Sequence, residues 1–283
     1  MNLFSGLEKF GLNPEASMNL FKEEAKEAEK KAAGKVEEKI PTEEEFLLDK
    51  TVRCKCCDTV FKTKTIKNGR LKRLEPDKDL RPRFQYIDSL KYDITSCPNC
   101  GYTAMNRYFE SLSPAQAKLI RENISSQFKK NTAPEPVTYT YDEAIDRYKL
   151  SLVNTMVKRG KDSEKAYTCL KISWLLRGKI ENMPESTPEE KQLKEACKKE
   201  ELAFYQQAYE GFTKATTKEM YPMCGMDEST LDYLISYMAY RFGKKEMASK
   251  FLAGVLQSPA ASRRLKDMAL DLKEEIIAQL RKK

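Results

Sequence analysis

The stretches Cys54-Lys55-Cys56-Cys57 and Cys97-Pro98-Asn99-Cys100 each contain a Cys-x-x-Cys pair, and 39 residues separate the two pairs. Together the pairs supply four thiolates, which is the ligand set of a closed tetrahedral Zn²⁺ site. The chain contains no histidine, and this excludes Cys₂His₂ fingers, histidine-ligated catalytic zinc and nucleophiles activated by an imidazole base. A site closed by four thiolates has no open position for a substrate. We therefore predict one structural Zn²⁺ held by Cys54, Cys57, Cys97 and Cys100.

The other cysteines give weaker signals. Cys56 lies inside the first pair and could compete as a ligand, although only Cys54 and Cys57 have the two-residue gap that the turn requires. A redox dithiol that cycles with a disulfide is the alternative for each pair, but the presence of a second matched pair favours the metal site. The remaining cysteines stand alone and are predicted to be inert thiols: Cys169, Cys197 and Cys224.

The composition indicates a soluble, helix-rich protein. The chain has 283 residues, of which 40% are hydrophobic and 33% are charged, and this length allows two domains with a modest core. No apolar run approaches the ~20 residues that span a bilayer. Residues 1–6 lack the basic and apolar regions of a signal peptide. We therefore expect a cytoplasmic protein without membrane contact, in which cysteines act as metal ligands or buried thiols.

The positive charge of the chain is concentrated around the cysteines. The chain carries 51 Lys and Arg against 43 Asp and Glu, a net charge of +8. Residues 50–91 alone hold 13 basic and 5 acidic residues, which accounts for the whole excess. Four thiolates and one Zn²⁺ add a net −2, so the zinc-bound segment would carry about +6.

This basic segment has two interpretations. Its side chains, with Phe84 and Tyr86 between them, could contact phosphates and stack on the bases of a nucleic acid. They could instead keep a small β module soluble and protect its strand edges. The candidate nucleic-acid contacts are Lys62, Lys64, Lys67, Arg70, Lys72, Arg73, Arg81 and Arg83.

The sequence between the cysteine pairs predicts β structure. Residues 60–66 are rich in β-forming side chains, and Asn68-Gly69 is a hairpin signal, so residues 70–74 are expected to form the return strand. A further strand over residues 91–96 is expected to lead into the second cysteine pair. Residues 75–90 contain two prolines and are expected to form an inserted loop.

The first 45 residues are predicted to form an N-terminal arm that is partly helical or disordered. The motif Met-Asn-Leu-Phe occurs at residues 1–4 and again at residues 18–21. Residues 22–45 are rich in Lys, Glu and Ala, and such a run cannot bury a core. The repeated motif could dock in a groove as a short helix, or it could pack back on the body of the protein.

The remainder of the chain carries helix signals. Ser113-Pro114-Ala115-Gln116 is a capping box that predicts a helix to about residue 128, followed by a linker over residues 129–138. Between residues 139 and 283, further capping boxes begin at Thr140 and Thr187. Three glycines are expected where helices end: Gly160, Gly178 and Gly243.

These helices look like irregular tetratricopeptide pairs. In residues 234–259 one helix ends at Gly243, and the next places the small Ala248 where it would cross the first. The helix expected over residues 188–215 is too long for a regular repeat. Aromatic residues at helical spacing are predicted to be core rather than a ligand site: Trp174, Tyr205, Tyr209, Phe212, Tyr233 and Tyr237.

The predicted fold class is therefore α+β, mostly α. A small zinc-ribbon-like β module with a flanking helix is expected over residues 46–130. An irregular tetratricopeptide-like helical domain is expected over residues 139–283.

Three groups of motifs, taken together, point to a known family. They are the first cysteine pair followed by Phe61-Lys62-Thr63-Lys64, Tyr92-Asp93 ahead of Cys97-Pro98-Asn99-Cys100-Gly101-Tyr102, and Gly225-Met226-Asp227-Glu228 at a helix start. Over roughly residues 46–280 the chain resembles the bacterial family known as domain of unknown function 2225. The resemblance implies a zinc module that uses the four paired cysteines, tetratricopeptide-like helices and no established activity. Asp58 stands where the family's first turn usually ends in glycine, and we expect the turn to be kept because Asp tolerates the left-handed conformation.

No motif of an enzyme accompanies these features. The sequence lacks a Walker loop, Gly-x-Gly-x-x-Gly and Gly-x-Ser-x-Gly, and the acidic pairs Glu189-Glu190 and Glu200-Glu201 are predicted to lie on solvated helix faces. We therefore predict a non-enzymatic zinc-binding adaptor whose helices bind a protein partner. The alternatives are a nucleic-acid-associated factor that uses the basic segment, and a thiol sensor that loses zinc on oxidation.

Overall fold

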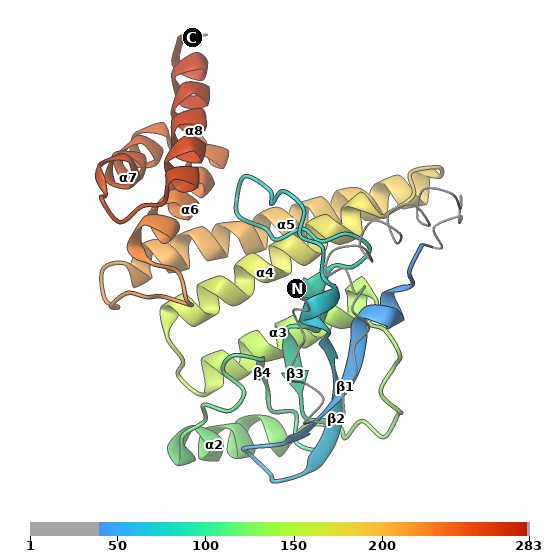
Figure 1. Cartoon of the computed structure of the whole chain (residues 1–283). Helices are drawn as coiled ribbons and strands as arrows, with labels where there is room; N and C mark the ends of the chain where they lie inside the picture. The colour runs from blue at the N-terminus through green and yellow to red at the C-terminus, as the bar shows by residue number, and fades with distance from the viewer. Residues whose placement is uncertain (1–39, 282–283) are drawn as a thin grey trace, which may run out of the picture. The chain divides into compact units, whose positions relative to one another are not determined.

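The computed structural model describes residues 40–281, and Figure 1 shows how their helices and strands are arranged. The described residues from Thr42 onward belong to one compact unit. The fold is α+β and mostly α, as predicted, with small two-stranded antiparallel sheets ahead of a helical region. Most of the predicted N-terminal arm, including both copies of Met-Asn-Leu-Phe, lies outside the described residues.

The β structure of the cysteine region consists of two antiparallel hairpins. Strand β1 (Leu47–Arg53) pairs with β2 (Val60–Ile66) over its whole length. Strand β3 (Ile94–Ser96) pairs with β4 (Thr103–Met105) in the same way. Each hairpin therefore turns at one Cys-x-x-Cys pair, and the two turns are the ends of two short ribbons.

The prediction that residues 70–74 form the return strand of a hairpin is wrong. Residues 60–66 do form a strand, but the partner of that strand is β1, which precedes the first cysteine pair. Asn68–Arg70 form a turn of 3₁₀ helix, and Arg73 makes only an isolated bridge to Phe84. Since β1 already pairs with β2, the Asn-Gly turn does not build a second hairpin.

The predicted loop is present, and it is docked on the helices. Residues 75–88 contain no regular helix or strand, and a 3₁₀ turn at Ser89–Tyr92 shortens the expected strand to β3. We call residues 71–88 the docking loop. Asp79 and Arg81 of this loop are only 1% and 2% exposed. Surface loops rarely bury charged side chains so completely, so the docking loop is part of the packed structure.

The helical region starts with α2 (Pro114–Ile120), whose last turn widens into a π-helix at Arg121–Ser125. The later helices are α3 (Tyr141–Val157), α4 (Asp162–Glu181), α5 (Pro188–Ala215), α6 (Glu228–Arg241), α7 (Lys245–Gln257) and α8 (Arg263–Arg281). Helix α4 packs against α3 and α5, and α7 packs against α6 and α8 (Figure 1). Among the described residues, no helix is both long enough and apolar enough to cross a membrane.

The predicted helix starts are confirmed. Ser113, Thr140 and Thr187 each accept a hydrogen bond from the amide three residues on, and the Gln or Glu at that position bonds back to the cap. The long helix expected over residues 188–215 is also confirmed at both ends. Gly243 follows α6 with a φ of +69°, a conformation that glycine adopts readily at helix ends.

The prediction that a helix ends at Gly178 is wrong. Gly178 lies inside α4 and is buried. A Cβ atom at this position would lie 2.8 Å from Arg81 Nη2 and 2.8 Å from Tyr141 Cε1. The glycine therefore allows the docking loop and α3 to approach α4 closely, which is a second common use of glycine in a helix.

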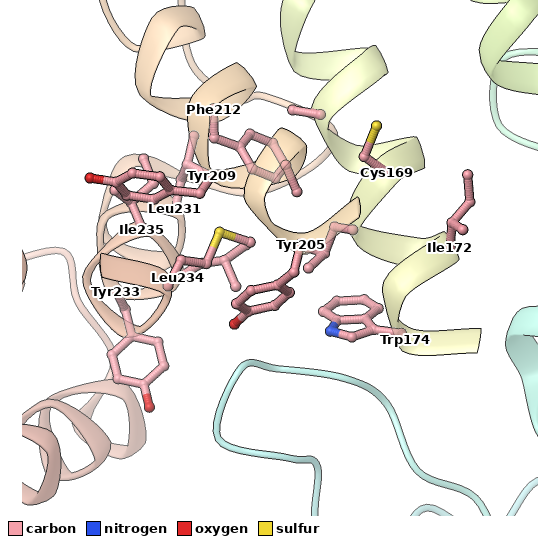
Figure 2. Close-up of a cluster of buried hydrophobic side chains, with 14 of the residues drawn as sticks. Cys169, Ile172, Trp174, Tyr205, Tyr209, Phe212, Leu231, Tyr233, Leu234 and Ile235 are labelled. Carbon is pink, nitrogen blue, oxygen red and sulfur yellow. The ribbon is translucent and has the colours of Figure 1, made fainter. Parts of the chain in front are cut away.

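The main core lies between α4, α5 and α6. The predicted aromatic core is confirmed for five of its six members, since Trp174, Tyr205, Tyr209, Phe212 and Tyr233 are each at most 4% exposed. The sixth, Tyr237, is half-buried and packs against the same cluster. Figure 2 shows Tyr205 and Tyr209 beside Leu234 and Ile235, with Trp174 next to Tyr205. Full burial of a side chain of this size contributes about 2–3 kcal/mol, so each of these rings stabilises the helical region.

The cysteine module and the helices share this core. Leu90, Ile94 and Met105 from the module lie in the same hydrophobic cluster as the helix residues. Hydrogen bonds cross the boundary as well: for example, Tyr148 Oη of α3 donates to the Leu90 carbonyl (3.1 Å), and Asn154 Nδ2 donates to the Gly101 carbonyl (3.0 Å). The two segments predicted over residues 46–130 and 139–283 thus pack on one another. The residues predicted as a linker, 129–138, contain no helix or strand and are mostly exposed.

Candidate metal centre

Four cysteine sulfurs converge where the two hairpin turns meet. The Sγ atoms of Cys54, Cys57, Cys97 and Cys100 all lie within 4.8 Å of one another. Cys54 Sγ lies 3.6 Å from Cys100 Sγ, and Cys57 Sγ lies 3.7 Å from Cys97 Sγ. Zinc–sulfur bonds of about 2.3 Å in a tetrahedron give sulfur–sulfur distances of about 3.8 Å. The structure therefore brings the four predicted ligands together at a spacing that fits a tetrahedral metal ion.

Both turns are closed by the same backbone hydrogen bonds. The amide of the first cysteine donates to the carbonyl five residues on, at 2.9 Å in each turn. The amide that follows the second cysteine donates back to the carbonyl of the first, at 3.0 Å from Asp58 and 3.1 Å from Gly101. The repeated pattern shows that the two-residue gap, rather than the intervening side chains, determines the turn.

The residue after each second cysteine has a left-handed backbone. Gly101 has a φ of +73° and Asp58 has a φ of +60°. The expected effect of Asp58 is therefore confirmed: the turn is kept, and the aspartate adopts the conformation that glycine would take. Gly101 has an additional reason to lack a side chain, since a Cβ atom there would lie 2.5 Å from Phe128 Cδ2.

The four thiols influence one another because they lie so close together. Hydrogen bonds from the Cys100 and Cys54 thiols lower the pKa of Cys97. Hydrogen bonds with Cys54, Cys56 and Cys97 raise the pKa of Cys100. Four thiolates at this spacing repel one another, so complete ionisation requires a cation among them. The donor set fits Zn²⁺, which binds four thiolates in this arrangement.

The centre is covered by α2 and by aromatic side chains. Tyr102 stacks on Phe109 with 4.8 Å between ring centres, and its hydroxyl donates to the Phe109 carbonyl (3.0 Å). Ser125 Oγ donates to the Cys100 carbonyl (2.8 Å), which ties the π-helical turn to the second cysteine turn. Asn99 Nδ2 donates to Cys57 Sγ at 3.5 Å. Such contacts hold metal ligands in place and stabilise the thiolate form.

The other cysteines stay outside the group of four. The Cys56 thiol donates to the Ala117 carbonyl on α2 (3.8 Å), and it also lies near Cys100, which lowers the pKa of Cys56 to about 7. Cys169, Cys197 and Cys224 are buried free thiols in separate places. Their burial fits the inert role predicted for them.

The basic residues predicted to contact nucleic acid fall into different environments. Arg81 is 2% exposed and forms ion pairs with Asp77, Asp88 and Glu181 at 3.0–3.6 Å. Arg83 pairs with Asp77 (2.8 Å) and Glu181 (2.7 Å). Both arginines therefore hold the docking loop on α4, and in this structure Arg81 is inaccessible to a phosphate.

The remaining basic candidates lie on β2, in the turn that follows it and at the start of the docking loop. Lys64 pairs with Asp49 across the β1–β2 hairpin (2.7 Å). Lys67 and Arg70 both donate to the Glu45 carbonyl, at 3.2 and 3.0 Å. Three exposed candidates form no ion pair with any residue in the range 40–281: Lys62, Lys72 and Arg73.

A buried charge network escaped the sequence analysis. The Asp79 side chain is fully buried, and its Oδ2 accepts hydrogen bonds from Trp174 Nε1 (3.0 Å) and Arg177 Nη2 (2.8 Å). Arg177 also pairs with Glu201 of α5 (3.0 Å), and Arg241 of α6 reaches the same carboxylate (3.2 Å). The network thus connects the docking loop to α4, α5 and α6 through charge-assisted hydrogen bonds.

The sequence contains two signals for this network. Glu201 shares the spacing of Tyr205, Ala208 and Phe212, which places it on the buried face of α5, so the prediction that Glu201 is solvated is wrong. Residues 77–83 alternate acidic and basic side chains around Leu80 and Pro82. A count of the basic residues alone overlooks that the arginines of this stretch can pair with its own aspartates.

These observations define a class of protein in which a module with four cysteines at metal-binding distances is packed on a helical region. The family described as "Uncharacterized protein conserved in bacteria (DUF2225)" matches residues 47–276. The chain belongs to this family, as the motifs in its sequence indicate. No curated protein and no solved structure matches the chain. The family description names no activity, so the function is argued from the structure.

Proposed function

We propose that this protein is a non-enzymatic adaptor in which one Zn²⁺ stabilises the cysteine module and the helices bind a protein partner. The closed set of four cysteines supports a structural role, because a catalytic zinc keeps one position open. Zinc is the ion of choice, since thiolates bind it in preference to hard cations such as Mg²⁺ and Ca²⁺. All eight cysteines are free thiols, which fits the reducing cytoplasm.

One observation carries the adaptor role: an apolar groove lies over α4, between α3 and α5. Its volume is about 570 Å³, and its lining includes Leu152 and Met156 of α3, Ala166 and Cys169 of α4, and Phe204 of α5. Met156 is 60% exposed. A groove lined by apolar side chains from neighbouring helices suits the apolar face of a partner helix.

The floor and the rim of the groove support this interpretation. A Cβ atom at Gly211 would lie 2.8 Å from Ala166 Cβ, so glycine lets α5 approach α4 closely beneath the groove. At the rim, Asp162 forms ion pairs with Lys165 (2.9 Å) and Lys214 (3.0 Å). An apolar floor with a charged rim is the usual anatomy of a protein interface.

The C-terminal helices support a tetratricopeptide-like arrangement. Ala248 is fully buried where α7 meets α6, as a small residue at a helix crossing should be. Ser236 Oγ of α6 donates to the Ala248 carbonyl at 2.7 Å, so the two helices approach closely at this point. We propose that α3 to α8 form a short, irregular stack of this type, with the groove as its binding surface.

Photo-crosslinking in the cell tests the adaptor role. We expect a photoreactive residue at Met156 to give a discrete protein adduct, and the same residue at Met220 to give none, because Met220 is 88% exposed but lies outside the groove. Adding Phe204→Asp should remove the adduct, with the fold checked by circular dichroism. Equal labelling from Met156 and Met220, or an adduct that survives Phe204→Asp, would reject the groove as the binding surface.

Nucleic-acid binding is the second candidate, and the exposed Lys62, Lys72 and Arg73 favour it. The test measures binding of labelled RNA and DNA at low and at physiological salt, because phosphate contacts weaken steeply with salt. Changing these three residues to Gln should abolish binding if the candidate is correct. A matched variant changes three exposed lysines elsewhere to Gln: Lys218, Lys250 and Lys273. Absence of binding at low salt would reject this candidate.

A further inference from the structure

A second cavity, of about 560 Å³, lies between the docking loop, the 3₁₀ turn at Ser89–Tyr92, α4 and α6. Its volume falls within the range of small-molecule sites, and like them it combines a mainly apolar wall with a few polar groups. The apolar lining includes Leu71, Leu80, Trp174, Met226 and Leu234. The cavity is distinct from the metal centre and from the groove over α4.

One ion pair belongs to the wall of this cavity. Lys171 of α4 is 6% exposed, and its ammonium donates to the Asp93 carboxylate. The ammonium also lies 4.5 Å from the centre of the Tyr167 ring. Burial lowers the pKa of Lys171, but the Asp93 carboxylate and the Tyr167 side chain together outweigh burial and raise it overall. Lys171 is therefore charged at neutral pH.

Each member of this pair keeps unused hydrogen-bonding capacity. An ammonium has three donors, and only Asp93 accepts one from Lys171 among the residues that the structure describes. Asp93 Oδ1 and the Thr230 hydroxyl, both in the cavity wall, likewise form no hydrogen bond with any described residue. Asp93 and Thr230 are half-buried and open to the cavity, so its wall offers a positive, a negative and a neutral polar contact to a ligand.

We propose that this cavity binds a free α-amino acid with a large apolar side chain. The α-carboxylate accepts hydrogen bonds from Lys171 and Thr230, and the α-ammonium donates to Asp93. The apolar side chain lies against the apolar wall of Leu80, Trp174 and Leu234.

The charge arrangement selects this class of ligand. Lys171 and Asp93 are adjacent and opposite in charge, and the two charged groups of an α-amino acid are attached to the same carbon. For a ligand with a carboxylate alone, repulsion from Asp93 offsets the attraction to Lys171, and for a ligand with an ammonium alone the reverse holds. Only a ligand with both charges is attracted by both groups, and these attractions are screened less in a partly buried site than in water.

Tryptophan fluorescence of the full-length protein tests the proposal. Trp174 is the only tryptophan in the chain and lines the cavity, so its emission reports occupancy. We expect a saturable change with L-phenylalanine. Two matched ligands, 3-phenylpropanoate without the ammonium and phenethylamine without the carboxylate, should each bind at least about tenfold more weakly.

Substitutions in the cavity wall test whether the ligand binds there. Lys171→Met should abolish binding, and Thr230→Val should weaken it several-fold with the fold intact, because Thr230 is partly exposed. Lys179→Met is the matched control, since Lys179 lies on the same helix but outside the cavity. No saturable change up to about 10 mM ligand would overturn the proposal. So would equal binding of either analogue, or a Thr230→Val protein that binds as tightly as Lys179→Met.

Discussion

Replacing Asp79 by Asn tests the buried network that holds the docking loop on the helices. The carboxylate of Asp79 is fully buried and accepts hydrogen bonds from Trp174 Nε1 and Arg177 Nη2. An asparagine side chain has nearly the same shape and can still accept one of these bonds. The change therefore removes the charge of Asp79 and leaves the packing of the loop almost unaltered.

The expected cost follows from what remains around Arg177. Breaking a buried ion pair costs about 3–5 kcal/mol when the remaining charge has no other partner. Arg177 keeps Glu201 at 3.0 Å and Asp77 at 3.4 Å, so it stays partly compensated. We therefore expect Asp79→Asn to lower the free energy of unfolding by about 2–3 kcal/mol.

Urea unfolding followed by far-UV circular dichroism measures this loss. Asp146→Asn is the matched control, because Asp146 is exposed on α3 and forms no ion pair among the described residues; we expect a change within about 0.5 kcal/mol. Combining Asp79→Asn with Arg177→Gln should cost less than the sum of the two single changes. A loss for Asp79→Asn no larger than that of the control would refute the role given to the network.

Two further predictions concern the cysteine turns and the Asp232 carboxylate of α6. Asp58→Gly should raise the free energy of unfolding by about 0.5 kcal/mol, because glycine adopts a φ of +60° without strain. Gly101→Ala should lower the free energy of unfolding by about 2 kcal/mol or more, because the added Cβ would meet Phe128. Equal effects of the two changes in thermal melts would contradict this description of the turns. Burial, with the nearby Glu228 carboxylate, raises the pKa of Asp232 from 3.8 to about 6. The ionised carboxylate therefore destabilises the fold above pH 6, and this penalty disappears as the pH falls toward 3.8. Asp232→Asn should stabilise the protein by about 2 kcal/mol at pH 7.5 and hardly at pH 4, and a pH-independent effect in urea unfolding would contradict this origin.

The two cysteine turns could be predicted from the sequence because they depend on local geometry. A two-residue gap between cysteines determines each turn, whatever the rest of the chain does. The capping boxes at Ser113, Thr140 and Thr187 are equally local, and the helices begin where they predict. Features that are determined within four or five residues are therefore the ones that a single sequence shows.

Strand pairing could not be predicted, because it depends on competition between distant segments. Residues 60–66 could pair with either neighbouring segment, and the Asn-Gly turn favours the one that follows. The segment that precedes them, β1, has only Leu47 and Val52 buried, so its strand pattern is weak in the sequence. In the structure β2 pairs with the preceding strand, β1, across the first cysteine turn.

Buried charges escape a single sequence for a similar reason. Arg81 finds its partner Glu181 one hundred residues away, and a count of basic residues treats every arginine as solvated. Gly178 resembles a helix end in the sequence, although its role is to admit that same arginine to the surface of α4. Long-range ion pairs have no periodicity, and they become visible only when the docking loop is placed on the helices.

The central claim is that four cysteines hold one zinc ion in a closed structural site. X-ray absorption at the zinc edge of the purified protein tests this claim most directly. We predict one zinc per chain with a shell of four sulfur atoms at about 2.3 Å and no lighter ligand. Absence of zinc, or a shell in which nitrogen or oxygen replaces one of the sulfurs, would contradict the assignment of Cys54, Cys57, Cys97 and Cys100 as the ligands.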